Sequence, residues 1–382
     1  MIPYGRQFVS QEDIDAVVKI LRSDFITQGP AVPAFEKALR DYAGASHSVA
    51  VSSATAALHI ACMALGLKSG GLLWTSPVTF VASANCALYC GAEVDFVDVN
   101  PRSGNLCIDR LKEKLVEAKQ SDRLPDILIP VHLGGQSCDM ETIAALSKEF
   151  GFRVIEDASH AVGGSYKSQK VGSCQFSDIT VFSFHPVKII TTGEGGMALT
   201  NDDQLAERMR LLRSHGITRD TSQMVSRSHG DWYYQQIDLG FNFRMTDIQA
   251  ALGLSQFQHL DEFVDDRQKL AESYDKQLES LPLKPLDRLQ ECQSAWHLYV
   301  VLLEDPKLRK RVFEGLRENG VGVNIHYIPV HLQPYYKDLG FNPGDFPNAE
   351  DYYQRAISLP MYPKLASRDL DYVCGLLGDI LN

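Results

Sequence analysis

Between residues 72 and 214, short apolar runs alternate with stretches of helical spacing, and this alternation restricts the possible folds more than any other feature. The apolar runs lie at residues 72–75, 94–97, 127–131, 153–155, 179–184 and 197–200. The helix-like stretches lie at residues 81–89, 109–118, 140–150 and 203–214. Repetition of strand, helix and strand predicts an α/β fold with a mostly parallel central sheet covered by helices on both faces.

The flanking segments predict a second, smaller domain. Before the sheet, helices are predicted at residues 11–22, with a Ser10/Asp13 capping box, and at 32–42, ended by Gly44, followed by a strand at 48–52. After it, helices are predicted at 247–257, 260–281, 306–319 and 367–381, with strands at 297–303 and 321–325. We therefore expect an N-terminal segment (1–25) packed near the active site, a large domain (26–254) and a small α+β domain (255–382).

Polar residues gather where the predicted strands end. They occupy positions 52–55, 76–80, 132–136, 157–160 and 183–188. Because ligands bind at the carboxyl ends of strands in such sheets, these segments predict one shared site.

Lys188 is the most unusual residue of this group. A lysine is normally a solvated surface residue, but Lys188 lies in a short loop between the strand-like runs VFSF and GGMALT. This loop holds the amine close to the protein body. A partly desolvated amine loses its proton more easily and can form a Schiff base.

Two further features suit the same chemistry. Residues 52–55 (SSAT) lead from a strand directly into an apolar helix, whose free N–H groups favour an anion, although an ordinary helix cap has the same pattern. Asp157 follows an apolar strand, where it caps the next segment or pairs with a buried cation. An amine, a carboxylate and an anion site together fit pyridoxal 5'-phosphate.

Composition excludes several other classes. The net charge of -11 and the pI near 5.5 argue against nucleic acid as the main partner. The eight cysteines form no CxxC pair, so no metal site is predicted. No signal-peptide pattern or membrane-length apolar run is visible, so we expect a cytoplasmic protein without a membrane partner.

The motifs FSFHPVKIITTGEGG, EDASHA, SSATAAL, SPVTFVASAN and GFNFRMTDIQAALG resemble the DegT/DnrJ/EryC1/StrS sugar aminotransferases nearly from end to end. The resemblance implies a fold type I enzyme dependent on pyridoxal phosphate. The segments EDASHAVGGSY, RSHGI, NIHYIPVHLQPYY and ISLPMYP are most similar to members that aminate C4 of a UDP-linked 4-keto-6-deoxy-N-acetylhexosamine, with L-glutamate as donor and 2-oxoglutarate as product.

The resemblance also implies roles for individual residues. Lys188 is the internal aldimine lysine and proton carrier, and Asp157 pairs with the pyridinium. Further cofactor contacts are implied for Ala54, Thr55, Phe80, His160, Ser183 and, from a partner subunit, Asn242. Asn242 makes a homodimer with a shared active site the expected unit. The sugar nucleotide is implied to contact Tyr4, Asp24, Phe25, Ile26, Thr27, Ile325, His326, Tyr327 and Ile328. Each of these residues alone also fits a core or turn position.

Three other interpretations remain. The dehydratase branch of the family has histidine in place of Lys188. A dehydrogenase is suggested by GxGxxA at 193–198, although this fingerprint must open a helix. A noncatalytic regulator can share the fold. Arg219 and Arg244 are candidates for binding the carboxylates of the amino donor.

Overall fold

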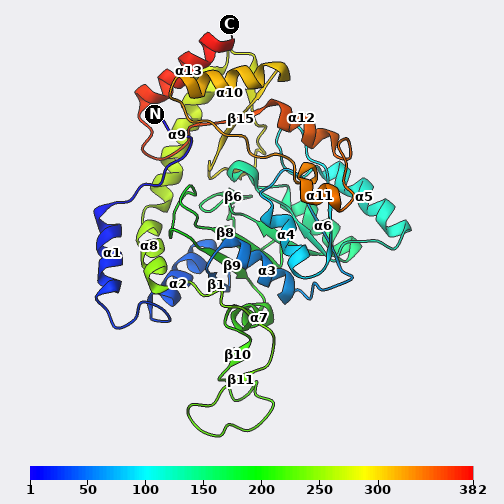
Figure 1. Ribbon diagram of the computed structural model, residues 1–382, viewed down its shortest axis with the longest axis vertical. Coiled ribbons are helices and arrows are strands. Elements are labelled where there is room, and N and C mark those ends of the chain that lie inside the picture. Colours follow the sequence, from blue (N-terminus) through cyan, green and yellow to red (C-terminus); the bar gives the residue numbers. More distant parts are fainter. Residues whose placement is uncertain (382) are drawn as a thin grey trace.

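The computed structural model describes residues 1–381, and a seven-stranded sheet with the order β1-β9-β8-β5-β4-β2-β3 lies at its centre (Figure 1). Strand β9 pairs antiparallel with both of its neighbours, and all other neighbouring strands in the sheet pair parallel. The predicted mostly parallel sheet is therefore confirmed. The strands are β1 (His47–Val51), β2 (Leu72–Thr75), β3 (Glu93–Phe96), β4 (Ile127–Ile129), β5 (Arg153–Asp157), β8 (Ile179–Ser183) and β9 (Gly196–Thr200).

Helices cover both faces of this sheet because successive strand residues point to opposite sides. Leu73 and Ile155 face a core shared with α3 (Ala54–Ala64), α4 (Ala82–Tyr89) and α7 (Asp203–Arg213). Their neighbours Trp74 and Val154 face a core shared with α5 (Ile108–Gln120) and α6 (Met140–Phe150). On that second side, α2 (Ala31–Ala43) and α8 (Asp247–Phe257) pack on the β1 end of the sheet.

The predicted helix ends at the N-terminus are confirmed. The helix α1 (Gln11–Leu21) begins with the capping box of Ser10 and Asp13, and α2 ends at Gly44, whose φ of 78° suits glycine. Helix α1 lies beside α8, and the chain before it runs along the small domain, where Ile2 bridges Val321 (Figure 1).

The small domain is built on a three-stranded antiparallel sheet of β12 (Leu283–Pro285), β14 (Tyr299–Leu303) and β15 (Ala356–Leu359). The predicted strand at 321–325 is wrong, because this segment turns between two partners, with Val321 bridging Ile2 and Asn324 bridging Ser358. The other elements are α9 (Leu260–Leu278), α10 (Arg309–Glu318), α11 (Pro334–Asp338), α12 (Pro347–Arg355) and α13 (Ser367–Leu381). The predicted boundary near residue 255 stays a prediction, and Asn382 lies outside the described residues.

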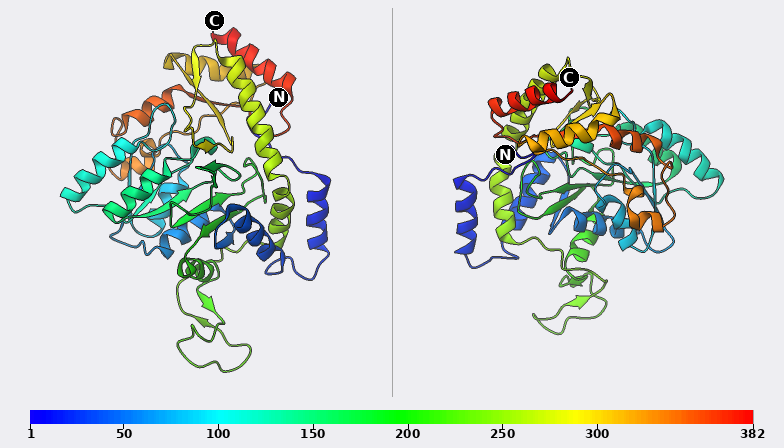
Figure 2. Two further views of the ribbon diagram at one scale, coloured as in Figure 1. Left: turned by 180° about the vertical axis from the view of Figure 1, so that it is seen from behind. Right: turned by 45° about the horizontal axis from the view of Figure 1, so that its top comes forward.

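Two small sheets complete the fold. Strands β6 (Ser165–Tyr166), β7 (Gln169–Lys170) and β13 (Cys292–Gln293) form one of them. Strands β10 (Ile217–Thr218) and β11 (Gln235–Gln236) form the base of an arm that extends away from the body (Figure 2). Among residues 1–381, no helix has the length and apolarity required to span a membrane.

Candidate active site

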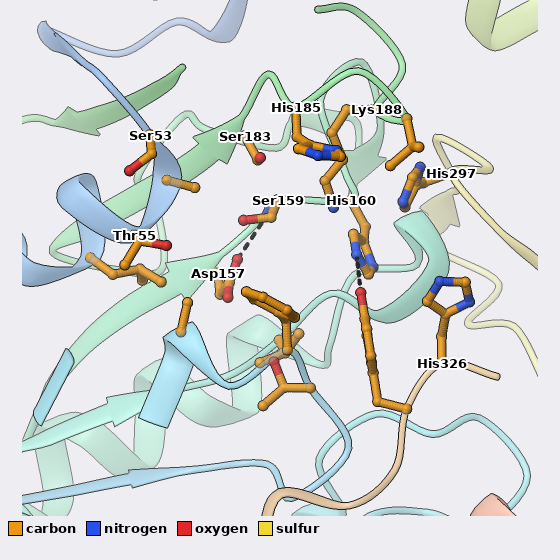
Figure 3. A pocket seen from close by; sticks show the side chains of 18 of the residues that line it. Ser53, Thr55, Asp157, Ser159, His160, Ser183, His185, Lys188, His297 and His326 are labelled. Carbon is orange, nitrogen blue, oxygen red and sulfur yellow. Dashed lines mark hydrogen bonds between the residues drawn. The ribbon is translucent and has the colours of Figure 1, made fainter. Parts of the chain in front are cut away.

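A cavity of about 510 Å³ lies at the carboxyl ends of β1, β2, β5 and β8 (Figure 3). Residues at the N-terminus and at 324–327 also line it, so distant parts of the sequence meet there. The predicted site residues found in its lining are Tyr4, Ala54, Thr55, Phe80, Asp157, His160, Ser183, Lys188, Ile325, His326 and Tyr327.

Lys188 lies in the loop that follows β8, where its backbone N–H donates to His185 O at 2.9 Å. The next residues, Ile189 and Ile190, are buried and anchor the loop in the core. Burial lowers the pKa of Lys188 to about 8, although the charge of Asp157 acts in the opposite direction. The amine is therefore partly neutral near physiological pH, as a nucleophile requires. The GxGxxA sequence that follows opens strand β9 instead of a helix, which removes the dehydrogenase interpretation.

Asp157 is the last residue of β5, and its carboxylate is buried. Its Oδ2 accepts a hydrogen bond from Ser83 Oγ at 2.6 Å, and its Oδ1 accepts one from the N–H of Ser159 at 3.1 Å. Ser83 in turn is 2.8 Å from Thr79 Oγ1. These bonds fix the orientation of the carboxylate. Sequence reasoning missed Ser83, although two hydroxyl residues four positions apart, Thr79 just before α4 and Ser83 within it, were an available signal.

The polar elbow predicted at residues 52–55 is confirmed as the start of α3. Ser53 caps the helix, and its Oγ accepts from the N–H of Ala56 at 3.1 Å. Within residues 1–381, the N–H groups of Ala54 and Thr55 have no acceptor. Gly196 lies directly against this elbow, since a Cβ at Gly196 would be 2.5 Å from Ala54 N. The free amides and the helix dipole make the elbow suitable for a phosphate.

His160 is buried at one wall of the cavity. Its Nδ1 accepts from the N–H of Gly134 at 3.2 Å, and its Nε2 is 3.1 Å from Tyr327 Oη. Burial and the nearby Lys188 hold the pKa of His160 well below its usual range, so the ring is neutral. Because Nδ1 is an acceptor, we assign the proton to Nε2, which donates to Tyr327. Phe80 is 59% exposed, and its ring centre lies 6.4 Å from that of Tyr327.

Some predicted residues lie outside the cavity of the single chain. They are Asp24, Phe25, Ile26, Thr27, Asn242 and Ile328, together with the candidate cations Arg219 and Arg244. Asn242 is exposed, and its backbone bridges Ser214 near the base of the arm. The roles of these residues stay predictions. The structure adds lining residues that sequence reasoning missed, among them His297 and Asn324.

The residues present fit the three polar parts of pyridoxal phosphate. A lysine amine with a lowered pKa suits its aldehyde, a buried carboxylate suits its ring nitrogen, and the free amides of α3 suit its phosphate. The fold and this set of groups together indicate an enzyme that uses pyridoxal phosphate.

The chain belongs to the DegT/DnrJ/EryC1/StrS aminotransferase family, whose profile matches residues 7–378. It is 39% identical to the spore coat polysaccharide biosynthesis protein SpsC of Bacillus subtilis, covering 100% of this chain and 97% of that protein. It is 38% identical to the UDP-4-amino-4,6-dideoxy-N-acetyl-beta-L-altrosamine transaminase of Campylobacter jejuni, covering 100% and 98%.

Solved structures agree with this membership. Helicobacter pylori PseC, an aminotransferase involved in the biosynthesis of pseudoaminic acid, superposes with a TM-score of 0.91 at 32% identity, covering 100% of this chain and 99% of that one. A putative sugar aminotransferase of Streptococcus pneumoniae in its PLP form has a TM-score of 0.89 at 27% identity, covering 100% of both chains. This protein is therefore a sugar aminotransferase that depends on pyridoxal phosphate, and the interpretation as a noncatalytic regulator is set aside.

Proposed function

We propose that the protein transfers an amino group from L-glutamate to C4 of UDP-2-acetamido-2,6-dideoxy-β-L-arabino-hex-4-ulose. The product is UDP-4-amino-4,6-dideoxy-N-acetyl-β-L-altrosamine, a precursor for pseudaminic acid, and 2-oxoglutarate is released. The likeness to the Campylobacter transaminase and to Helicobacter PseC supports this substrate. The structural observation that carries the proposal is that His326 and Tyr327 of the small domain line the same cavity as Lys188. We expect the reaction in the cytoplasm.

The roles of the cofactor-side residues follow from their chemistry. Bound pyridoxal phosphate would supply an aldehyde carbon that takes up the amino group and a ring that withdraws electrons. Lys188 Nζ would hold that aldehyde in the resting enzyme and would move the proton at the substrate carbon. Asp157, whose carboxylate is oriented by Ser83 and Ser159, would keep the ring nitrogen protonated because its negative charge stabilises the protonated ring. The amides of Ala54 and Thr55 would bind the phosphate together with Ser183, and Phe80 would cover the ring.

The charge of the cavity supports a shared active site in a homodimer. Among the lining residues of the described chain, Lys188 is the one lysine or arginine, although phosphates and carboxylates must bind there. We infer that a second copy supplies further polar groups, with its Asn242 at the cofactor phosphate. The residues at 24–27 and 325–328 are proposed to hold the sugar nucleotide.

A mixed dimer tests this sharing. Lys188→Ala and Asn242→Asp are each expected to be inactive, but mixing their unfolded subunits before refolding is expected to restore activity. Half of the dimers are then mixed and one of their two sites is intact, so the mixture should reach about one quarter of wild-type activity. If both functional residues come from one chain, the mixture will stay inactive.

The substrate is tested by incubating the holoenzyme with L-glutamate and a panel of UDP- and dTDP-linked 3-keto and 4-keto sugars, following 2-oxoglutarate and the aminated sugar by mass spectrometry. Preferred turnover of the UDP-linked 4-keto sugar is expected. The comparable identity to the spore coat protein makes a different nucleotide-linked keto-sugar the second candidate. Turnover of dTDP-linked ketones alone would reject the UDP substrate and keep the class of enzyme.

A further inference from the structure

His297 is a buried histidine that lines the active-site cavity without any assigned role. It is only 4% exposed, and its Nδ1 has no hydrogen-bond partner. Within residues 1–381, Nε2 also has no partner. Figure 3 shows the imidazole facing the same space as Lys188 and His160. Because buried polar groups are almost always satisfied, the free imidazole points to a ligand atom that completes its hydrogen bonding.

The position of His297 is fixed by a buried arginine. Arg267 Nη1 donates to the backbone oxygens of Trp296 at 3.0 Å, His297 at 3.4 Å and Met361 at 3.0 Å. The ring of His297 also packs on that of His160, with 4.4 Å between ring centres. Both backbone and side chain are therefore held in place before a substrate binds, which lowers the entropic cost of a contact.

The chemistry of the ring favours an uncharged oxygen. Burial, Lys188 and His160 all hold the pKa of His297 well below its usual range, so the ring stays neutral. A neutral imidazole offers one donor and one acceptor, as a hydroxyl does, but it offers no charge to a carboxylate. Beside its C4 carbonyl, the proposed sugar carries a hydroxyl on C3, whereas the amino donor carries carboxylates.

We propose that His297 hydrogen-bonds a sugar oxygen next to the reacting carbon and so positions the keto-sugar, and not the amino donor, against Lys188. This inference rests on the proposed function, because it requires a keto-sugar as the amino acceptor. It adds a specificity residue to the segments at 24–27 and 325–328.

The two half-reactions test this assignment separately. In the first, L-glutamate alone is mixed with the holoenzyme and the change in cofactor absorbance is followed. In the second, the aminated enzyme is freed of donor and mixed with the keto-sugar. For His297→Ala, we expect the donor half-reaction to stay within about threefold of wild type and the sugar half-reaction to lose about tenfold in kcat/KM, the size of one neutral hydrogen bond. His297→Gln, which keeps a donor and an acceptor, is expected to recover part of this loss.

The controls distinguish loss of the contact between His297 and the sugar from misfolding of the variant and from a wrong substrate assignment. His47→Ala changes a histidine at the first position of β1, at the end of the strand away from the cavity, and is expected to leave both half-reactions unchanged. The thermal midpoint identifies any misfolded variant, and His297→Gln then carries the test. An equal loss in both half-reactions, or no loss in either, would overturn the assignment. A wild-type enzyme that aminates no keto-sugar would instead reject the proposed function.

Discussion

Ser83 Oγ donates a 2.6 Å hydrogen bond to Asp157 Oδ2, joining residues that are 74 positions apart. Ser83 lies on α4, whereas Asp157 ends β5, so the bond ties a helix to the centre of the sheet. The other carboxylate oxygen accepts from the N–H of Ser159. The carboxylate at the base of the cavity thus has a fixed orientation before any cofactor binds.

Replacing Ser83 by alanine is expected to lower kcat by about tenfold, because Asp157 loses its buried donor and holds the ring nitrogen less well. Ser83→Thr keeps the hydroxyl and should retain most of the activity. Steady-state kinetics and the pH dependence of the cofactor spectrum provide the measurement. Equal rates for the alanine variant and wild type would show that Ser159 alone fixes the carboxylate.

The amine of Lys188 should react at an unusually low pH. Its pKa is lowered to about 8 by burial, so its neutral fraction rises as pH increases through that value. We expect labelling of Lys188 by acetic anhydride in the apoprotein, measured by mass spectrometry, to be half-maximal near pH 8. Asp157→Asn removes a charge that stabilises the ammonium form of Lys188. In this variant, labelling of Lys188 should therefore be half-maximal at a lower pH than in wild type. A midpoint near 10.5 in both proteins would contradict the burial of the amine.

The contact between Gly196 and the elbow makes a steric prediction. A Cβ at Gly196 would lie 2.5 Å from both Ala54 N and Ser53 C, which are backbone atoms that cannot rotate away. Gly196→Ala is expected to weaken binding of pyridoxal phosphate at least about tenfold, or ~1.4 kcal/mol, by displacing the amides of α3. Fluorescence titration of the apoprotein measures this affinity.

Gly375→Ala is the matched control, because a Cβ there meets nothing within 4 Å in helix α13. It should leave cofactor affinity unchanged. It should also stabilise the protein slightly, by about 0.5–1 kcal/mol, because alanine favours a helix over glycine. Unchanged cofactor affinity in Gly196→Ala would show that the elbow does not hold the phosphate.

The buried pair of His132 and Glu156 predicts that the stability of the protein depends on pH. His132 Nε2 lies 2.8 Å from Glu156 Oε2. Burial lowers the pKa of His132, but its interactions with Cys138 and Glu156 outweigh burial and raise the pKa to about 10. Protonation gives up the 3.3 Å bond that Nδ1 accepts from the N–H of Cys138, so the ion pair with Glu156 must exceed that loss. The stabilising contribution is complete below the ordinary value near 6.5 and is lost as pH rises through about 10.

The double variant His132→Gln and Glu156→Gln should lose this dependence. We expect the thermal midpoint of wild type, measured relative to that of the variant, to decrease as the pH is raised from 7 to 10. Calorimetry at both pH values gives this difference. A constant difference would indicate that His132 is neutral in the folded protein.

The sequence predicted site residues whose positions depend on a single strand or helix, but it did not predict those whose positions depend on packing between elements. Lys188, Asp157 and the start of α3 follow from strand ends and a helix cap, which are local patterns. Ser83 and His297 were missed because their contacts depend on how α4 and the segment before β14 pack against the sheet. The strand expected at 321–325 failed for the same reason, since its partners, Ile2 and Ser358, lie far away in the sequence.

We expect Lys188 to carry the cofactor. Holoenzyme is reduced with borohydride, digested and analysed by mass spectrometry, with Lys188→Ala treated in parallel. We expect a pyridoxyl group on the peptide that contains Lys188, none in the variant, and loss of turnover in the variant. A pyridoxyl group on any other lysine, or undiminished transamination by Lys188→Ala, would contradict it.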